Sequence, residues 1–212
     1  TGMISEQKPD EALGGLLADM MGLGKTLSIL SLITSSLGSA EEWTEMAPDP
    51  VLVRRTAGIR NTRTTLLVVP LSAVSNWVTQ IKEHLKPRSV TYYVFHGPSR
   101  TTDSKELSEY DIVITTYSTI LSEISGRGAK SGKLSPLTKM NMFRIVLDEA
   151  HVIREQNTAQ TKAILGLNSE RRWSVTGTPI QNRMEDLLSV TRFLRIAPYD
   201  QRSQFSQHVC SP

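Results

Sequence analysis

Short apolar segments alternate along the chain with longer segments in which apolar residues recur every three or four positions. The short segments are rich in Val, Ile and Leu, which is typical of strands buried on both faces. They predict strands near residues 15–18, 65–69, 90–95, 111–115, 143–148 and 172–176. The periodic segments predict helices over 25–36, 73–85, 116–124, 155–167 and 184–195. The alternation predicts βαβ units, and therefore an α/β fold with a mainly parallel sheet and helices on both faces.

Two stretches do not follow this alternation. Residues 37–63 place four acidic residues before four arginines and contain two prolines. Residues 125–138 are rich in Gly, Ser and Lys. Because structureless loops of this length are uncommon inside a compact domain, we expect both stretches to be mobile insertions in one domain that covers residues 1–212.

Composition and charge narrow the class of protein. A chain of 212 residues fits one α/β domain. The apolar run at 66–71 is far shorter than the roughly 18 residues that a membrane helix needs, so no membrane span is expected. The net charge of +3 permits a nucleic-acid partner without requiring one. The single cysteine excludes an intramolecular disulfide and a zinc site built from several cysteines.

A phosphate-loop pattern follows the first predicted strand and opens the first predicted helix: Gly22-Leu23-Gly24-Lys25-Thr26. Glycines let backbone N–H groups turn around a phosphate, and the helix start adds the positive end of its dipole. In such a loop the lysine reaches the β- and γ-phosphates and the threonine hydroxyl binds Mg²⁺. Asp19 stands where the usual pattern has its first glycine, so a tight turn with a surface lysine is the alternative at this point.

Two adjacent acids, Asp148 and Glu149, close the apolar segment at 145–147. Hydrolysis of a nucleotide bound with Mg²⁺ needs a carboxylate that holds the metal and a second group that orients or deprotonates water. Asp148 suits the first task and Glu149 the second. With Lys25 they form the predicted catalytic set, and Thr26 and Asp148 the predicted metal ligands. The alternative, a solvated acidic turn, is less favoured when a phosphate loop lies upstream.

The order of the motifs resembles a known family. After the phosphate loop come two further motifs, Asp148-Glu149-Ala150-His151 and Thr176-Gly177-Thr178-Pro179-Ile180-Gln181-Asn182. The combination resembles the N-terminal RecA-like lobe of a Swi/Snf-type superfamily-two helicase-like ATPase. That family writes its phosphate loop Asp-Glu-Met-Gly-Leu-Gly-Lys-Thr, which accounts for Asp19, whereas Met20 replaces the family glutamate. Residues 151–154, 171–173 and 193–195 resemble the branch that contains the helicase-like transcription factor and its yeast post-replication-repair relatives.

The resemblance implies a P-loop NTPase lobe that binds ATP and Mg²⁺ and acts on duplex DNA through backbone contacts. A second lobe, absent from this chain, is then needed for hydrolysis, so the isolated lobe is expected to be weakly active or inactive. The resemblance also implies a nuclear protein of chromatin remodelling or DNA repair, with chromatin or repair proteins as further partners.

Further site residues follow from the resemblance. The resemblance implies that hydroxyls and turn N–H groups contact DNA phosphates at Ser72, Thr115 and Thr116. Ordinary turn and cap chemistry is the alternative for each. Residues implied to couple the nucleotide state to the grip on DNA are His151, Thr176, Gly177 and Thr178. Trp77, which belongs to the motif around 69–77, is expected to pack its helix against the sheet.

Two other functions stay open at this point. The chain would be a nucleotide-independent DNA- or protein-binding scaffold if the lobe were degenerate, although an intact Lys25 and Asp148-Glu149 argue against degeneracy. It would be a GTPase-type switch if it read guanine, but the chain contains no Asn-Lys-x-Asp segment.

Overall fold

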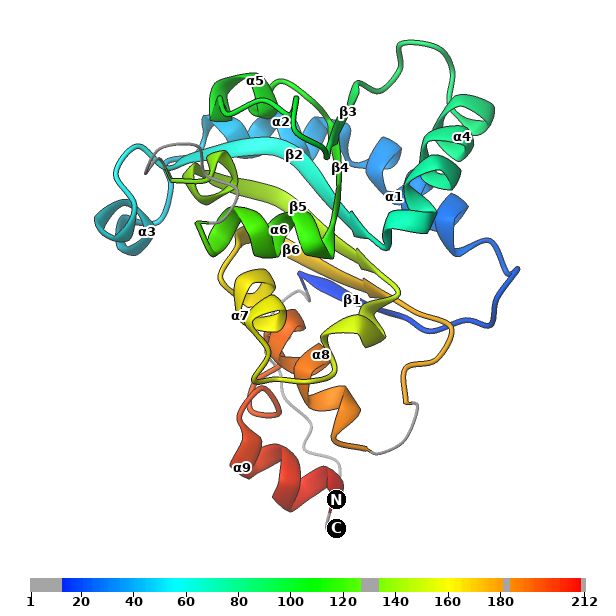
Figure 1. Cartoon of the computed structure of the whole chain (residues 1–212), viewed down its shortest axis with the longest axis vertical. Coiled ribbons are helices and arrows are strands. Elements are labelled where there is room, and N and C mark those ends of the chain that lie inside the picture. Colours follow the sequence, from blue (N-terminus) through cyan, green and yellow to red (C-terminus); the bar gives the residue numbers. More distant parts are fainter. Residues whose placement is uncertain (1–12, 127–133, 181–183, 211–212) are drawn as a thin grey trace, which may run out of the picture.

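The computed structural model describes residues 13–126, 134–180 and 184–210. Within these ranges the strands form one six-stranded sheet in the order β1-β6-β5-β2-β4-β3 (Figure 1). All neighbouring strands are parallel. The strands are β1 (Gly14–Leu17), β2 (Arg60–Val69), β3 (Tyr92–Phe95), β4 (Ile112–Thr116), β5 (Met140–Asp148) and β6 (Asn168–Val175). The predicted α/β fold with a parallel sheet is therefore confirmed.

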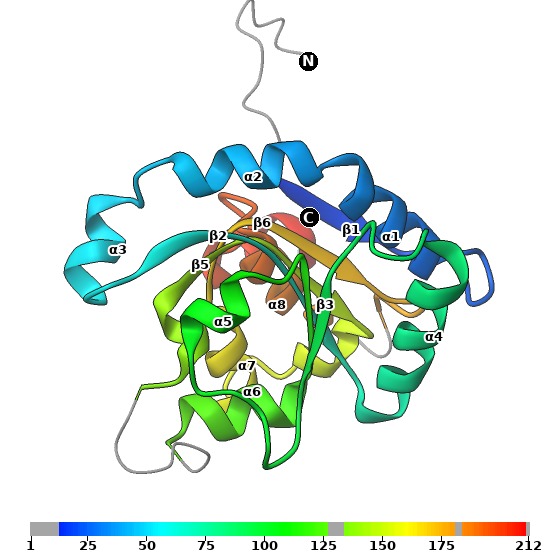
Figure 2. The ribbon, with the colours of Figure 1, turned by 90° about the horizontal axis from the view of Figure 1, so that it is seen from above.

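Helices cover both faces of the sheet, as predicted (Figure 2). One face carries α1 (Lys25–Ser35), α2 (Leu37–Glu45) and α4 (Val74–His84). The other carries α6 (Tyr117–Ile124), α7 (Ala159–Leu165) and α8 (Asp186–Leu194). The short helices are α3 (Pro50–Arg55), α5 (Ser104–Ser108) and α9 (Arg202–Phe205). Single turns of 3₁₀-helix lie at Leu71–Ala73, Pro136–Lys139 and Ala150–Ile153, and a π-helical turn at Ser206–Cys210.

The predicted positions of the elements hold, whereas some boundaries move. The helix predicted over 155–167 begins at Ala159, because the Thr158 side chain accepts a hydrogen bond from the backbone N–H of Thr161 and caps α7 there. The strand predicted from 172 begins at Asn168, because its first residues pair with β5. Both shifts come from contacts that periodicity does not encode.

The stretch 37–63, predicted to be a mobile insertion, carries α2, α3 and the start of β2. Its mobility stays a prediction, whereas these three elements were not predicted. The Trp43 indole N–H donates to the Asn141 carbonyl at 3.3 Å, and the Asn61 amide donates to the carbonyls of Trp43 and Met46. These contacts join α2 to residues far away in the chain, which explains why the local pattern did not predict them. Of the other predicted insertion, 125–138, residues 127–133 lie outside the described ranges.

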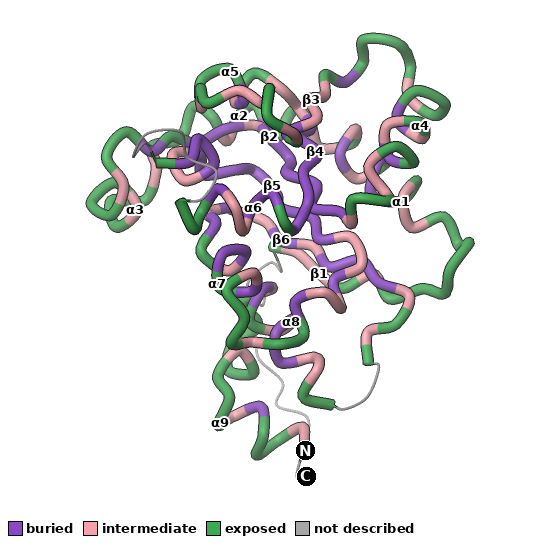
Figure 3. Tube along the Cα trace, in the orientation of Figure 1, coloured by how far each residue is buried: buried purple, intermediate pink, exposed green. Residues whose placement is uncertain are grey.

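Two apolar layers enclose the sheet. The central strands β2, β4 and β5 are almost wholly buried, whereas the edge strands β1 and β3 are mostly half-buried (Figure 3). One layer packs Ile29, Leu30 and Trp77 against strand residues such as Val146. The opposite layer packs Tyr117, Ile120 and Phe193 against the other side of the same strands. Two-sided burial accounts for the continuous apolar runs in the sequence. No helix in the described part of the chain is long and apolar enough to cross a membrane.

Candidate functional site

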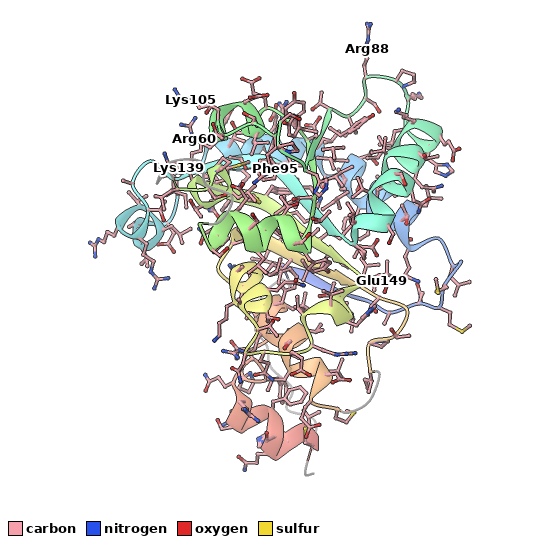
Figure 4. All side chains as sticks on the ribbon, in the orientation of Figure 1. Arg60, Arg88, Phe95, Lys105, Lys139 and Glu149 are labelled. Carbon is pink, nitrogen blue, oxygen red and sulfur yellow. The ribbon has the colours of Figure 1, made fainter. Side chains whose placement is uncertain are left out.

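Three neighbouring strands end at the same level and bring the predicted motifs together. Leu17 at the end of β1 pairs with Val175 at the end of β6, and Val175 pairs with Asp148 at the end of β5. Figure 4 shows Glu149 where β5 leaves the sheet. The loop before α1, the turn after β6 and the two carboxylates therefore share one edge. Open parallel sheets bind their ligands at this carboxyl edge.

The glycine loop between β1 and α1 is exposed over residues 18–24. Gly22 has φ 84° and Gly24 has φ 74°, in the left-handed region that favours glycine. A Cβ at either position would meet no atom within 4 Å, so the backbone conformation, and not crowding, requires glycine. The loop thus presents open space directly before the first turn of α1, which is the arrangement expected of a phosphate cradle.

Lys25, the first residue of α1, folds back over this loop. Its Nζ donates to the carbonyl oxygens of Asp19 and Met20, each at 2.8 Å. Met20 is 74% exposed, and its carbonyl oxygen still accepts the hydrogen bond from Lys25. The methionine that replaces the family glutamate therefore does not disturb this backbone contact. The ammonium bonds only neutral acceptors within the described chain, and an anionic phosphate oxygen is a stronger acceptor. Lys25 is therefore available to exchange these carbonyls for a phosphate.

Asp148 is held by hydrogen bonds from three different elements. Its Oδ2 accepts from the Trp77 indole at 2.8 Å, and its Oδ1 accepts from the Glu149 N–H at 3.0 Å. Its backbone carbonyl accepts from the Tyr117 hydroxyl at 2.7 Å. Burial raises the pKa of Tyr117 well above its ordinary value, with smaller contributions from the charges of Asp148 and Glu149. The phenol thus stays protonated as a donor, and each carboxylate oxygen keeps a further lone pair for a ligand.

Glu149 turns away from the strand with φ 51° and ψ 51°, an uncommon backbone conformation for a residue other than glycine. Its Oε2 lies 3.1 Å from Nδ1 of His151. The same His151 nitrogen lies 3.4 Å from the Thr176 hydroxyl, and the Thr178 N–H donates to that hydroxyl at 3.2 Å. A polar chain therefore connects the end of β5 with the turn after β6.

The turn after β6 also reaches the glycine loop. A Cβ on Gly177 would lie 3.4 Å from Cγ of Met21 and 3.8 Å from the Asp19 carbonyl oxygen. All four residues predicted to couple nucleotide and DNA (His151, Thr176, Gly177 and Thr178) thus lie between the carboxylates and the glycine loop. Their coupling role stays a prediction, whereas their position beside the site is observed. Gln181 and Asn182 lie outside the described residues.

Two of the three residues predicted to contact DNA have partners inside the lobe. Thr115 is fully buried and its hydroxyl donates to the Phe95 carbonyl at 2.9 Å. Thr116 is 1% exposed, and its hydroxyl accepts from the Thr119 N–H and so caps α6. Both hydroxyls thus serve the cap and turn chemistry considered as the alternative, because solvent does not reach either of them here. The DNA contact predicted for this segment stays a prediction. Ser72 is exposed in the 3₁₀ turn Leu71–Ala73, and its DNA contact stays a prediction.

Sequence reasoning missed the polar role of two aromatic residues. Trp77 packs against the sheet as predicted, with 1% exposure, but its N–H also reaches Asp148. Tyr117 was not among the predicted site residues, and its hydroxyl bonds the same residue. A hydrogen bond over 71 positions leaves no periodic pattern in the sequence, so local patterns gave no signal for these contacts.

The matched family model is the SNF2-related domain, which covers residues 3–212. DNA repair protein RAD5A of Arabidopsis thaliana is 36% identical over 228 residues, covering 95% of this chain and 22% of that protein. The helicase-like transcription factor of Homo sapiens is 42% identical over 151 residues, covering 71% of this chain and 14% of that protein. The chain thus spans less than a quarter of the length of either relative. The resemblance to this branch of the family is confirmed.

A solved structure shares the fold. The Sulfolobus solfataricus SWI2/SNF2 ATPase core in complex with dsDNA has a TM-score of 0.63 and 30% identity, over 91% of this chain and 33% of that chain. Its likeness agrees with the all-parallel sheet and the motif order along the carboxyl edge. The chain therefore belongs to the SNF2-related family and forms the N-terminal ATPase lobe of that fold.

Proposed function

We propose that this lobe binds and helps to hydrolyse ATP in a DNA-dependent ATPase that translocates along duplex DNA. The observation that carries the proposal is the meeting of the glycine loop, Asp148–Glu149 and Thr176–Thr178 at one edge of the sheet. A fold of this class hosts many functions, so these side chains, and not the fold, indicate the function.

The phosphates of ATP bind over the glycine loop at the start of α1. Lys25 exchanges its two carbonyl acceptors, Asp19 and Met20, for oxygens of the β- and γ-phosphates. The exchange replaces two neutral acceptors by charged ones, which strengthens the hydrogen bonds of the ammonium.

Thr26 and Asp148 supply the oxygen donors for Mg²⁺. The Thr26 hydroxyl makes no hydrogen bond within the described residues, and Asp148 retains acceptor capacity on both carboxylate oxygens. Among the described residues, no cluster of three or more His, Cys, Asp or Glu side chains could hold a metal ion without further ligands. A few protein oxygens suit Mg²⁺, which is usually held jointly with substrate phosphates and, when bound, neutralises charge on their oxygens.

Glu149 acts as the base that receives a proton from the water attacking the γ-phosphorus. Its left-handed backbone directs it away from Asp148, so the two carboxylates serve separate tasks. His151 lies 3.1 Å from its Oε2 and orients it toward the turn after β6. Thr176 accepts the Thr178 N–H and joins the same polar chain.

Duplex DNA is the proposed macromolecular partner, held through its backbone. The support is the Sulfolobus relative, whose ATPase core was solved in complex with dsDNA. Relatives named as a DNA repair protein and a transcription factor support a role in repair or chromatin remodelling, and with it a nuclear location. Chromatin or repair proteins are the further partners we infer.

Turnover in this proposal requires a second lobe. Arginines of that lobe would stabilise charge on the transferring phosphoryl group. The 212-residue chain covers 33% of the solved ATPase core, in agreement with one lobe of a larger motor. We therefore expect the isolated chain to bind nucleotide weakly and to hydrolyse it poorly, and rapid turnover by the isolated chain would contradict this point.

The test is steady-state ATP hydrolysis by the complete gene product, with and without duplex DNA, beside Glu149→Gln. Hydrolysis that duplex DNA stimulates and that falls about a hundredfold in Glu149→Gln supports the proposal. The variant should still bind ATP, because Lys25 and Asp148 are unchanged. Glu83→Gln, an exposed acid-to-amide change on α4, is the matched control and should retain full activity. Duplex binding by a folded protein without any hydrolysis would instead favour the scaffold function.

A further inference from the structure

Two buried aromatic donors grip Asp148 from opposite faces of the sheet. Trp77 belongs to the apolar layer that includes α1 and α4, and Tyr117 to the layer that includes α6. The indole bonds the carboxylate at 2.8 Å and the phenol bonds the backbone carbonyl of the same residue at 2.7 Å. The last residue of β5 is therefore fixed both at its side chain and at its main chain.

Each aromatic residue is rigidly connected to a strand-end segment that lies farther along the sheet edge. Trp77 lies in α4, which directly continues the 3₁₀ turn that carries the exposed Ser72. Tyr117 is the first residue of α6, and Thr116 before it caps that helix. Because helices move as rigid bodies, a shift of either segment would move its aromatic donor relative to Asp148.

The need of a buried indole for an acceptor does not by itself explain why Trp77 bonds Asp148. A buried indole N–H needs an acceptor, and a backbone carbonyl satisfies that need. Trp43 shows this case at the other end of β5, where its N–H donates to the Asn141 carbonyl at 3.3 Å. Trp77 instead donates to the charged side chain that the site uses, over a shorter distance.

We propose that Trp77 and Tyr117 are positioning residues that transmit contact with DNA at the α4 and α6 segments to the metal-binding carboxylate Asp148. The inference rests on the proposed function and adds to it a route from the DNA grip to the ATP site. DNA bound at the exposed turn before α4 steadies Trp77, and DNA bound at the start of α6 steadies Tyr117. The two donors then hold Asp148 in the orientation that binds Mg²⁺ together with ATP.

The experiment uses the complete gene product and compares Trp77→Phe and Tyr117→Phe with two matched controls. Trp43→Phe removes an indole N–H from the other end of the same strand. Tyr93→Phe removes a hydroxyl that accepts from the Thr101 N–H. The first readout is the Mg²⁺ concentration at half-maximal binding of a fluorescent ATP analogue, and the second is the ratio of hydrolysis with and without duplex DNA.

Trp77→Phe should raise the half-maximal Mg²⁺ concentration about tenfold, because removal of a partner of a metal ligand has this effect on affinity. Tyr117→Phe, which deletes a single oxygen, should shift it in the same direction by less, and both variants should lose most of the stimulation by DNA. The two controls should match wild type in both readouts.

The failures are distinguishable. Wild-type protein that binds no nucleotide would overturn the proposed function, and this inference with it. Wild-type binding with Trp77→Phe and Tyr117→Phe indistinguishable from Trp43→Phe and Tyr93→Phe would overturn the inference alone. If Trp77→Phe fails to fold, Tyr117→Phe decides the question by the same two readouts.

Discussion

Lys25 and Asp148 lie at the two sides of β6, at the same edge of the sheet, yet their contacts differ in kind. Lys25 bonds two carbonyls of its own loop, five and six positions away. Asp148 is bonded by Trp77 and Tyr117, which are 71 and 31 positions away and come from opposite faces. One side of the site is therefore built from neighbouring residues, and the other depends on the assembled fold.

Lys25 and Asp148 should therefore differ in how much each contributes to ATP binding and to the stability of the fold. A residue held by its own exposed loop can be removed with little loss of folding free energy, because few partners are left unsatisfied. A residue that receives several buried donors cannot, because each donor left without its acceptor costs free energy. The following predictions use this difference, from the largest expected effect to the smallest.

Lys25→Ala should lower the affinity for ATP about a hundredfold or more. Lys25 is the single basic residue of the motif at residues 22–26, so the variant loses the positive charge that faces the phosphates. Its thermal unfolding temperature should remain that of wild type. Binding of a fluorescent ATP analogue and a melting curve on the same samples measure the two effects. The exposed Lys162→Ala on α7 is the control, and a large loss of stability in Lys25→Ala would contradict the local character of this side.

Asp148→Asn should weaken binding of ATP in the presence of Mg²⁺ by about tenfold and also lower the free energy of unfolding by about 2 kcal/mol. The amide has one acceptor oxygen, so either the Trp77 indole or the Glu149 N–H faces a donor. Urea unfolding of the 212-residue chain measures the second effect. An unchanged free energy of unfolding would show that the hydrogen bond from Trp77 to the Asp148 side chain contributes nothing to stability.

Gly24→Ala should destabilise the chain by about 1 kcal/mol, because φ 74° is unfavourable for a residue with a Cβ. Gly38 in α2 is the matched control: it also has open space around it, but its backbone is helical. Gly38→Ala should stabilise the chain by about 0.5 kcal/mol. Urea unfolding of both variants tests the contrast, and equal effects of the two substitutions would refute it.

Tyr117→Phe should change how stability depends on pH. The pKa of Tyr117 is raised in the folded chain, so the unfolded chain loses this proton first as the pH passes about 10. Wild-type stability attributable to this group is therefore complete below that pH and is lost as the pH rises toward the folded value. The phenylalanine variant lacks this loss, so its deficit of about 1 kcal/mol at neutral pH should shrink and then reverse in alkaline solution. Parallel stability curves for the two proteins would contradict this.

The agreement between sequence and structure follows the same division. The strands, the main helices and the loop at 22–26 were predictable, because each is encoded by residues close together in the chain. Residues 37–63 were not, because Trp43 and Asn61 find their partners in other elements. The sequence also did not decide between DNA contact and cap chemistry for the hydroxyls of Thr115 and Thr116, both of which the structure buries in β4.

By its sequence alone, this protein determines the order of the strands and the main helices, the glycine loop with Lys25, and the pair Asp148–Glu149 at a strand end. These features depend on backbone preference and on apolar periodicity, which act over a few residues. Only the tertiary structure decided that Trp77 and Tyr117 hold Asp148 and that Gly177 contacts the glycine loop. The strand order β1-β6-β5-β2-β4 creates these contacts, because it brings together strand ends that lie far apart in the sequence.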